Sequence, residues 1–244
     1  MNEQTHPDSS CPIIRVLDLQ KDFGYLQALS GISFDLNKGE FLTIFGPNGA
    51  GKTTLIKVLT GLTRPTSGSA SIDGFDVLEG NAALRNQIGV LSHTTCLYPD
   101  LTALENFLFY AKLYGLDDPE KRANESIREA GLQLRRHDPV RTYSRGMQQR
   151  MAIARATLHD PSVLFLDEPF TGLDLRATNA LKNHLHNLHT GKRTIIMTTH
   201  DISCGLEMCD KVAIQHKGKF LLLESVDKID RENFENFYTE ILEK

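Results

Sequence analysis

The sequence contains no apolar run long enough to cross a membrane. Its longest apolar stretches, at residues 163–166 and 220–223, have the length of a β-strand, whereas a membrane-spanning helix needs about 20 apolar residues. The first ten residues are polar and lack the basic start and the apolar core of a secretory signal. We therefore expect a protein of the cytoplasm.

An excess of one charge and a metal-binding cysteine pattern are also missing. The formal net charge of the 244 residues is -4, so there is no basic stripe, and no nucleic acid is expected as a partner. The four cysteines, Cys11, Cys96, Cys204 and Cys209, show no C-x-x-C or metal-ligand spacing, which is typical of a reducing compartment. Hydrophobic residues make up 40% and charged residues 24% of the chain, the balance of an ordinary globular protein.

What the sequence does contain is an alternation of strand and helix patterns. From Ile13 onward, short apolar runs alternate with segments of helical period, which predicts an α/β fold. We expect buried parallel strands at residues 41–45, 163–166 and 194–198, and an apolar helix at residues 52–59.

The length of the chain fits one domain with an inserted lobe. We expect a disordered lead-in at residues 1–12, a single domain at 13–224, and a helical lobe inserted at about 96–158, where strand signals are few. Residues 225–244 predict an amphipathic C-terminal helix that packs on its own domain, with docking of a partner as the alternative. A solvated face is expected for the helix that carries three histidines, His184, His186 and His189.

A glycine-rich loop after the first of these strands has the pattern G-x-x-x-x-G-K-T. Its residues are Gly46, Pro47, Asn48, Gly49, Ala50, Gly51, Lys52 and Thr53, and with Thr54 they are candidates for binding a nucleotide. A strand before the loop and a helix after it let successive backbone N–H groups surround phosphate oxygens. Lys52 would neutralise the β- and γ-phosphates, and Thr53 would give its hydroxyl to Mg²⁺. A structural turn rich in glycine is the alternative.

Two carboxylates end the strand at residues 163–166. Asp167 and Glu168 follow the apolar run directly, and a buried strand seldom ends in this way without a cation or a water to organise. We expect Asp167 to hold Mg²⁺ and Glu168 to accept a proton from the attacking water.

With these motifs the chain resembles the nucleotide-binding subunits of ABC transporters over nearly its whole length. The resemblance implies a P-loop NTPase cassette with a RecA-like parallel-sheet core, an antiparallel β subdomain and the inserted helical lobe. It also implies that ATP, with Mg²⁺, is hydrolysed with the help of Lys52, Glu168 and His200. Asp174, in Thr171-Gly172-Leu173-Asp174, would contact a partner protomer.

The resemblance also assigns the adenine contact. In the family an aromatic residue ahead of the loop stacks on the base, and Phe23 in Lys21-Asp22-Phe23-Gly24 stands in that place. Tyr25 is the second candidate. A core aromatic without contact to the nucleotide is the other alternative, because a single aromatic residue is not specific.

The signature of the family, LSGGQ, has the form Tyr143-Ser144-Arg145-Gly146-Met147 in this chain. Ser144 and Gly146 are retained, Arg145 replaces a glycine, and Ser144 is a suitable N-cap for the helix that follows. The resemblance implies a head-to-tail homodimer in which Ser144, Arg145 and Gly146 of one chain face the nucleotide of the other. Arg145 is therefore expected at the dimer seam.

A second departure from the family is His93, where most relatives carry glutamine near the metal. Imidazole is a poor Mg²⁺ ligand compared with an amide oxygen. We expect His93 to hold a water near the nucleotide by hydrogen bond.

The helical lobe gives the subfamily. Residues 101–115, His93 and the form of the signature resemble the ATP-binding subunit of the haem exporter of cytochrome c maturation. The resemblance implies haem export or release of a haem chaperone, integral membrane subunits as partners that handle the haem, and a position at the cytoplasmic face of the membrane. Multidrug and polysaccharide exporters share the Leu-Thr-x-x-Glu-Asn pattern, so an ATPase of a multidrug, lipid or polysaccharide exporter is the alternative.

A soluble ABC ATPase outside transport is the more distant alternative. A version for DNA maintenance would need a long coiled coil between the loop and the signature, and the sequence has no such insertion. A nucleotide sensor without hydrolysis is disfavoured because Glu168 and His200 are both present.

Overall fold

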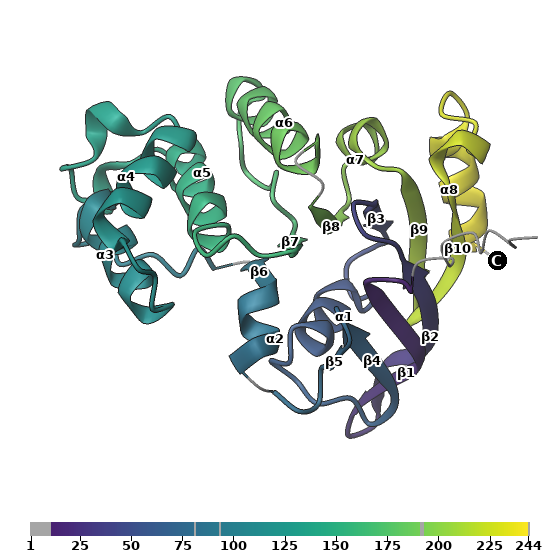
Figure 1. The fold of residues 1–244 in the computed structure, drawn as a ribbon. Helices are drawn as coiled ribbons and strands as arrows, with labels where there is room; N and C mark the ends of the chain where they lie inside the picture. Colours follow the sequence, from purple (N-terminus) through teal and green to yellow (C-terminus); the bar gives the residue numbers. More distant parts are fainter. Residues whose placement is uncertain (1–10, 81, 93, 191–192, 244) are drawn as a thin grey trace, which may run out of the picture.

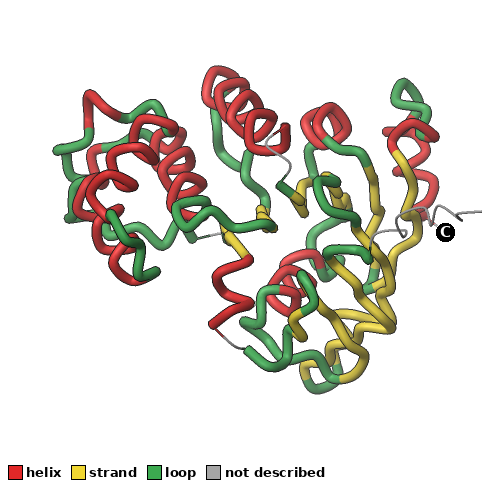
Figure 2. Tube along the Cα trace, viewed as in Figure 1, coloured by secondary structure: helices red, strands yellow, loops and turns green. Residues whose placement is uncertain are grey.

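The computed structural model describes residues 11–80, 82–92, 94–190 and 193–243. Within these ranges the chain forms two β-sheets and a group of helices that stands to one side of them (Figure 1). Figure 2 shows the strands in yellow gathered at the lower right and this group of helices in red at the left. Most of the expected disordered lead-in, residues 1–10, lies outside the described residues.

The larger sheet has six strands, and all but one of them are parallel. Its order is β10 (Lys219–Ser225), β9 (Lys211–His216), β3 (Phe41–Phe45), β8 (Thr194–Thr199), β7 (Val163–Asp167) and β6 (Ile88–Leu91). Only β10 runs antiparallel to its neighbour. The predicted buried strands are confirmed as β3, β7 and β8. Because β8 lies between β3 and β7, the carboxyl ends of these three strands are adjacent.

Burial on both faces explains the unbroken apolar runs of these strands. Successive side chains of a strand point to opposite faces, and Phe165 belongs to one hydrophobic cluster while Leu164 belongs to another. Helix α1 (Lys52–Leu59) and the smaller sheet cover the first face. Helices α6 (Leu175–Thr190) and α7 (Ile202–Met208) cover the second.

The smaller sheet is antiparallel throughout. Its order is β2 (Leu26–Leu36), β1 (Ile14–Phe23), β4 (Ser67–Ile72) and β5 (Phe75–Asp76). Ile14 and Val16 share a cluster with Leu55 and Ile56 of α1, so one face of this sheet packs across the first helix. The predicted combination of a parallel core and an antiparallel β subdomain is therefore confirmed.

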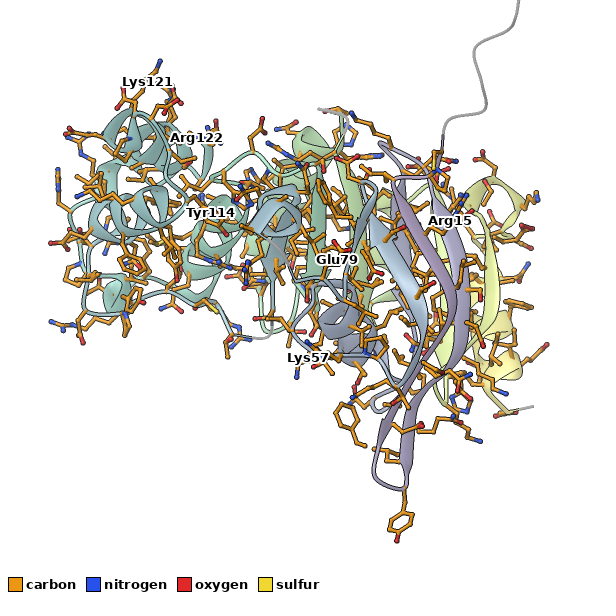
Figure 3. All side chains as sticks on the ribbon, turned by 60° about the horizontal axis from the view of Figure 1, so that its bottom comes forward. Arg15, Lys57, Glu79, Tyr114, Lys121 and Arg122 are labelled. Atoms are coloured by element: carbon orange, nitrogen blue, oxygen red, sulfur yellow. The ribbon has the colours of Figure 1, made fainter. Side chains whose placement is uncertain are left out.

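The group of helices at one end of the molecule has a core of its own. Its helices are α3 (Ala103–Leu113), α4 (Pro119–Glu129) and α5 (Arg145–Ala156), and the short α2 (Ala82–Gln87) leads into β6. A capping box starts α3: the Thr102 hydroxyl accepts the N–H of Glu105 at 3.2 Å, and the Glu105 carboxylate accepts the N–H of Thr102 at 2.7 Å. In Figure 3, Lys121 and Arg122 lie in this lobe and Arg15 lies on β1 at the other end.

Helix α5 joins the lobe to the larger sheet. Met151 belongs to the core of the lobe, whereas Ile153 belongs to the cluster behind the sheet. Arg155 reinforces the junction, because its guanidinium donates to the Val90 carbonyl of β6 at 2.7 Å. None of the helices in the described ranges combines the length and the hydropathy that a membrane span requires.

The C-terminal helix is shorter than the expected segment at 225–244, since α8 covers Phe234–Glu243. The Asp230 carboxylate accepts N–H groups two and three positions later in the chain, at 3.2 and 3.4 Å, and such a local turn competes with a helix. The expectation that the helix packs on its own domain is confirmed. The Phe234 ring is 1% exposed and lies 5.6 Å from the Phe45 ring.

The expected solvated face of α6 was wrong for two of its three histidines. Burial lowers the pKa of His184. His189 follows the buried Leu185 by about one turn, so it faces the sheet, and its Nε2 lies 2.9 Å from the Gly39 carbonyl oxygen. His186 alone is exposed as predicted.

Close packing of α7 on β3 depends on Gly205. A Cβ at this position would collide with the Phe45 ring and lie 2.9 Å from Thr43 Cγ2. We expect Gly205→Ala to reduce the free energy of unfolding by about 1–3 kcal/mol, even though alanine favours helix. Thermal unfolding would show this as a fall in Tm of about 2–4 °C per kcal/mol. The exposed Ser203→Ala on the same helix is the control, and equal Tm values for the two variants would contradict this account.

Candidate functional site

The glycine-rich loop connects the carboxyl end of β3 to α1. Gly49 and Gly51 have left-handed φ values of 81° and 105°, which turn successive N–H groups toward the inside of the loop. Lys52 is 7% exposed, and its Nζ donates to the carbonyl oxygens of Gly46 at 2.6 Å and Pro47 at 3.3 Å. The loop therefore holds a cation and N–H donors in the arrangement that binds phosphate.

Strand β9 supports the loop from below. A Cβ on Gly46 would collide with the main-chain oxygen of Gln215, and a Cβ on Gly51 would collide with the Ala28 carbonyl and lie 2.8 Å from Gln215 Nε2. These contacts explain why both positions are glycine. Gln215 was not among the site residues expected from the sequence. An amide at the end of the apolar run 212–214 was the available signal.

Thr53 and Asp167 lie together at the side of the loop. The Thr53 hydroxyl donates to Asp167 Oδ2 at 2.9 Å, and the Thr198 hydroxyl donates to Asp167 Oδ1 at 2.7 Å. A hydroxyl and a carboxylate are oxygen ligands that fit Mg²⁺. In the described part of the chain, no group of three or more His, Cys, Asp or Glu side chains could hold a metal. A cation here would therefore take its other ligands from nucleotide and water, as Mg²⁺ commonly does.

Glu168 adopts a strained backbone conformation that aims its carboxylate at the loop. Its φ is 52°, a region that costs a residue other than glycine about 1–3 kcal/mol. The Glu168 N–H donates to the Thr198 carbonyl at 3.0 Å. The carboxylate lies 3.6 Å from Lys52 Nζ and 2.7 Å from His200 Nδ1. Because an ionised carboxylate only accepts, Nδ1 carries the proton of this bond. The Glu168 carboxylate is thus a hydrogen-bond acceptor that His200 holds in place beside Lys52.

A pocket of about 320 Å³ opens over the loop. It is lined by residues 47–54 of the loop, by Glu168, and by Phe23, Leu26, Gln27 and Ala28 of the β1–β2 hairpin. The Phe23 ring is 51% exposed and Lys21 Nζ lies 4.8 Å from its centroid, so the ring is available to a base. Tyr25, the second candidate, is exposed and does not belong to the described lining.

Comparison with known proteins accounts for this combination of loop, carboxylates and histidine. A family model described as ABC transporter matches residues 29–171, more than half of the 244 residues.

The chain belongs to the ABC transporter family.

Individual relatives agree with this assignment. The chain is 35% identical over 213 residues to the linearmycin resistance ATP-binding protein LnrL of Bacillus subtilis (strain 168), covering 86% of this chain and 68% of that protein. It is 35% identical over 223 residues to the bacitracin transport ATP-binding protein BcrA of Bacillus licheniformis, covering 91% and 72%.

Among solved structures, the chain is similar to the dimeric post-hydrolysis state of the ATP-binding cassette MJ0796 bound to ADP and Pi. The TM-score is 0.79 at 27% identity, covering 87% of this chain and 98% of that chain. The predicted ABC cassette fold and ATP hydrolysis coupled to transport are therefore confirmed.

The signature segment of this ABC ATPase lies outside the nucleotide pocket of its own chain. The Ser144 hydroxyl accepts a first-turn N–H of α5 at 3.3 Å, so Ser144 is the N-cap that the sequence predicts. Arg145 Nε donates to the Thr171 carbonyl at 3.0 Å, and Gly146 packs against Ala177 of α6. None of the three signature residues is among the described residues that line the pocket.

Asp174 lies with the signature residues and not with the loop. Its carboxylate accepts the N–H of Ala177 at 2.7 Å and thereby supports the start of α6. The predicted nucleotide contacts thus fall into two sets, one around the loop and one around the N-terminus of α5. His93 lies outside the described residues, and its contact with the nucleotide stays a prediction.

Thr198 connects the Asp167 carboxylate to the backbone of Glu168, and a substitution of equal shape tests this connection. We expect Thr198→Val to reduce the free energy of unfolding by about 1–3 kcal/mol and to lower kcat for ATP by about 10- to 100-fold, because Asp167 loses one of its two hydroxyl donors. Thr194→Val is the matched control at the other end of β8, where the hydroxyl accepts the Gly39 N–H at 2.9 Å. Both variants are measured by steady-state ATPase assay and by thermal unfolding. An equal fall in kcat in the two variants would contradict our expectation.

Proposed function

We propose that the chain is the ATPase subunit of an ABC exporter of drugs, lipids or polysaccharides. Two relatives support this class, because their names speak of linearmycin resistance and bacitracin transport. The haem exporter expected from the lobe segment draws no support from these names. The observation that carries the reaction itself is the meeting of Lys52, Glu168 and His200 at the carboxyl ends of adjacent strands.

In this proposal each residue of the loop pocket has one task. Lys52 neutralises the phosphate oxygens, and Glu168 accepts a proton from the attacking water. His200 orients the Glu168 carboxylate, because His200 Nδ1 is hydrogen bonded to this carboxylate at 2.7 Å. When bound by Thr53 and Asp167, Mg²⁺ would supply further positive charge at the β- and γ-phosphates.

A second copy of the chain completes the site. Ser144 caps a helix whose positive end is suited to a phosphate, yet this end does not line the pocket of its own chain. A head-to-tail homodimer brings it to the nucleotide of the partner and places the exposed Arg145 at the seam. The cassette MJ0796, to which this chain is similar, is dimeric.

Membrane subunits complete the transporter, and the chain binds them at the cytoplasmic face of the membrane. A pocket of about 640 Å³ between the helical lobe and the larger sheet suits such a contact. Leu62, Leu113, Tyr114 and Arg155 are among its lining residues, and Figure 3 shows Tyr114 where the lobe meets the sheets. Because β6 and α5 also border this pocket, a membrane subunit bound there is connected to the nucleotide site through the larger sheet.

Capture of the complex tests the exporter class. Glu168→Gln keeps the shape of the side chain but removes the proton acceptor, so we expect ATP binding to persist and kcat to fall by about 10²–10⁴. The tagged variant, purified from membranes with ATP, should retain its integral membrane subunits, which mass spectrometry identifies. The control is Glu79→Gln, an exposed carboxylate (labelled in Figure 3), which should hydrolyse ATP normally.

The same preparation separates the alternatives. A large permease without haem absorption supports the exporter class. Small haem-handling membrane proteins together with a haem spectrum would replace it by the haem exporter, and soluble partners alone would overturn the transport assignment.

Mixing two inactive variants tests the head-to-tail dimer. Lys52→Ala disables the loop, whereas Ser144→Asp keeps a capping side chain but places a negative charge where a phosphate would lie. A heterodimer has one intact site, built from the loop of one chain and the signature of the other. We expect the mixture to hydrolyse ATP several-fold faster than either variant alone, at about half the wild-type rate at most. A mixture no more active than the mean of its components would rule out the shared site.

A further inference from the structure

Gln215, the residue before the last of strand β9, has a buried side-chain amide that makes no hydrogen bond within the described residues. The residue is 0% exposed, and neither Nε2 nor Oε1 has a partner among the described residues. Burial of an amide without partners is unfavourable. Leucine or methionine would fill a similar volume in the run 212–214 without that cost. Position 215 therefore carries a polar group that has no hydrogen-bond partner in this packing.

The amide lies directly beneath the phosphate-binding loop. Gln215 Nε2 is 2.8 Å from the point where Gly51 would carry a Cβ. The turn after β9 is bonded to the loop as well, because the Gly218 N–H donates to the Ala50 carbonyl at 2.9 Å. The Gly218 carbonyl in turn accepts the N–H of Ser30 in β2 at 2.9 Å. Three main-chain segments thus meet around Gln215: the loop, the β9–β10 turn and β2.

Ala28 of β2 presents an acceptor at the same place. Its carbonyl oxygen is close enough to Gly51 to collide with a Cβ there, so this oxygen and Gln215 Nε2 border one small space. Ala28 falls at an irregularity of the β1–β2 register, between the pairs Lys21–Leu29 and Asp22–Gln27. A carbonyl oxygen has two lone pairs and accepts a second hydrogen bond readily.

The Ala28 segment also borders the pocket above the loop. Leu26, Gln27 and Ala28 line this pocket together with Phe23 and the loop. A nucleotide in the pocket would therefore contact both the hairpin and the loop, next to the Ala28 carbonyl and the buried amide.

We propose that Gln215 is a positioning residue for ATP, whose Nε2 donates to the Ala28 carbonyl when nucleotide closes the β1–β2 hairpin against the phosphate-binding loop. This inference rests on ATP binding in the pocket above the loop. The hydrogen bond belongs to the bound state, so it strengthens binding without entering the chemical step. In the nucleotide-free protein the same unpaired amide lowers the stability of the fold. Its effect on stability and its effect on nucleotide binding can therefore be measured separately.

The test measures Gln215→Leu with and without ADP and Mg²⁺. We expect the Tm of the nucleotide-free protein to rise by about 2–4 °C, because an unpaired buried amide is removed. We expect the ADP-induced rise in Tm to shrink, because binding to the folded state sets that rise. KM for ATP should increase about fivefold while kcat stays within about twofold of wild type.

Ser126→Ala is the matched control. Ser126 lies in α4 of the helical lobe, is 1% exposed, and its hydroxyl has no partner in the part of the chain that the structure describes. Its replacement should raise Tm equally with and without ADP and leave KM unchanged. A purely structural Gln215 would behave in the same way, so an unchanged ADP-induced rise in Gln215→Leu would overturn the inference.

Two further outcomes are decisive. A fall in kcat at constant KM would also overturn the positioning role, since it would move the effect to the chemical step. If Gln215→Leu does not fold, Gln215→Met, which keeps an unbranched side chain of similar length, is measured with the same readouts. If ADP does not raise the Tm of the wild type, nucleotide binding in the pocket is itself overturned. A difference between Gln215→Leu and Ser126→Ala in the ADP-induced rise in Tm requires that binding.

Discussion

The position of β8 between β3 and β7 is the constraint on which the rest of the site depends. The parallel register of the three strands brings the loop after β3, the carboxylates at the end of β7 and His200 after β8 to one edge of the sheet. Thr198 of β8 then bonds the carboxylate of Asp167 and the backbone of Glu168. The main-chain hydrogen bonds of the sheet therefore bring the site residues together, and side-chain hydrogen bonds then orient them.

Around this edge, the molecule gives up local stability where nucleotide must bind. Glu168 holds a left-handed backbone, the loop has no Cβ at Gly46 or Gly51, and Gln215 keeps an unpaired amide below it. Each lowers the stability of the folded state and persists because the clusters on both faces of the sheet fix the surrounding backbone. All three features lie near the carboxyl ends of parallel strands, where ligands of such sheets bind.

The helical lobe adds a second function to the same sheet. Its helix α5 shares residues between the core of the lobe and the cluster behind the sheet, so its N-terminus, with Ser144 and Arg145, is carried on a rigid element. None of its residues is among the described residues that line the pocket of the same chain. The proposed head-to-tail dimer would join the signature of one copy to the loop of the other.

The sequence by itself determined the family, the parallel strands, the loop and the capping of α3 and α5, because each depends on residues close together in the chain. The phosphate loop and the pair Asp167–Glu168 could be assigned from spacing alone, as local backbone geometry dictates their residue types. The tertiary structure decided what depends on contacts between distant segments: the burial of His184 and His189 on the side of α6 that faces the sheet, and the place of Gln215 beneath the loop. Periodicity reports which face of an element is apolar, but not which polar side chains another element will cover. The burial of Gln215 is fixed only when β9 meets β2 and the loop, although Gln215 follows the loop by more than 160 residues in the chain.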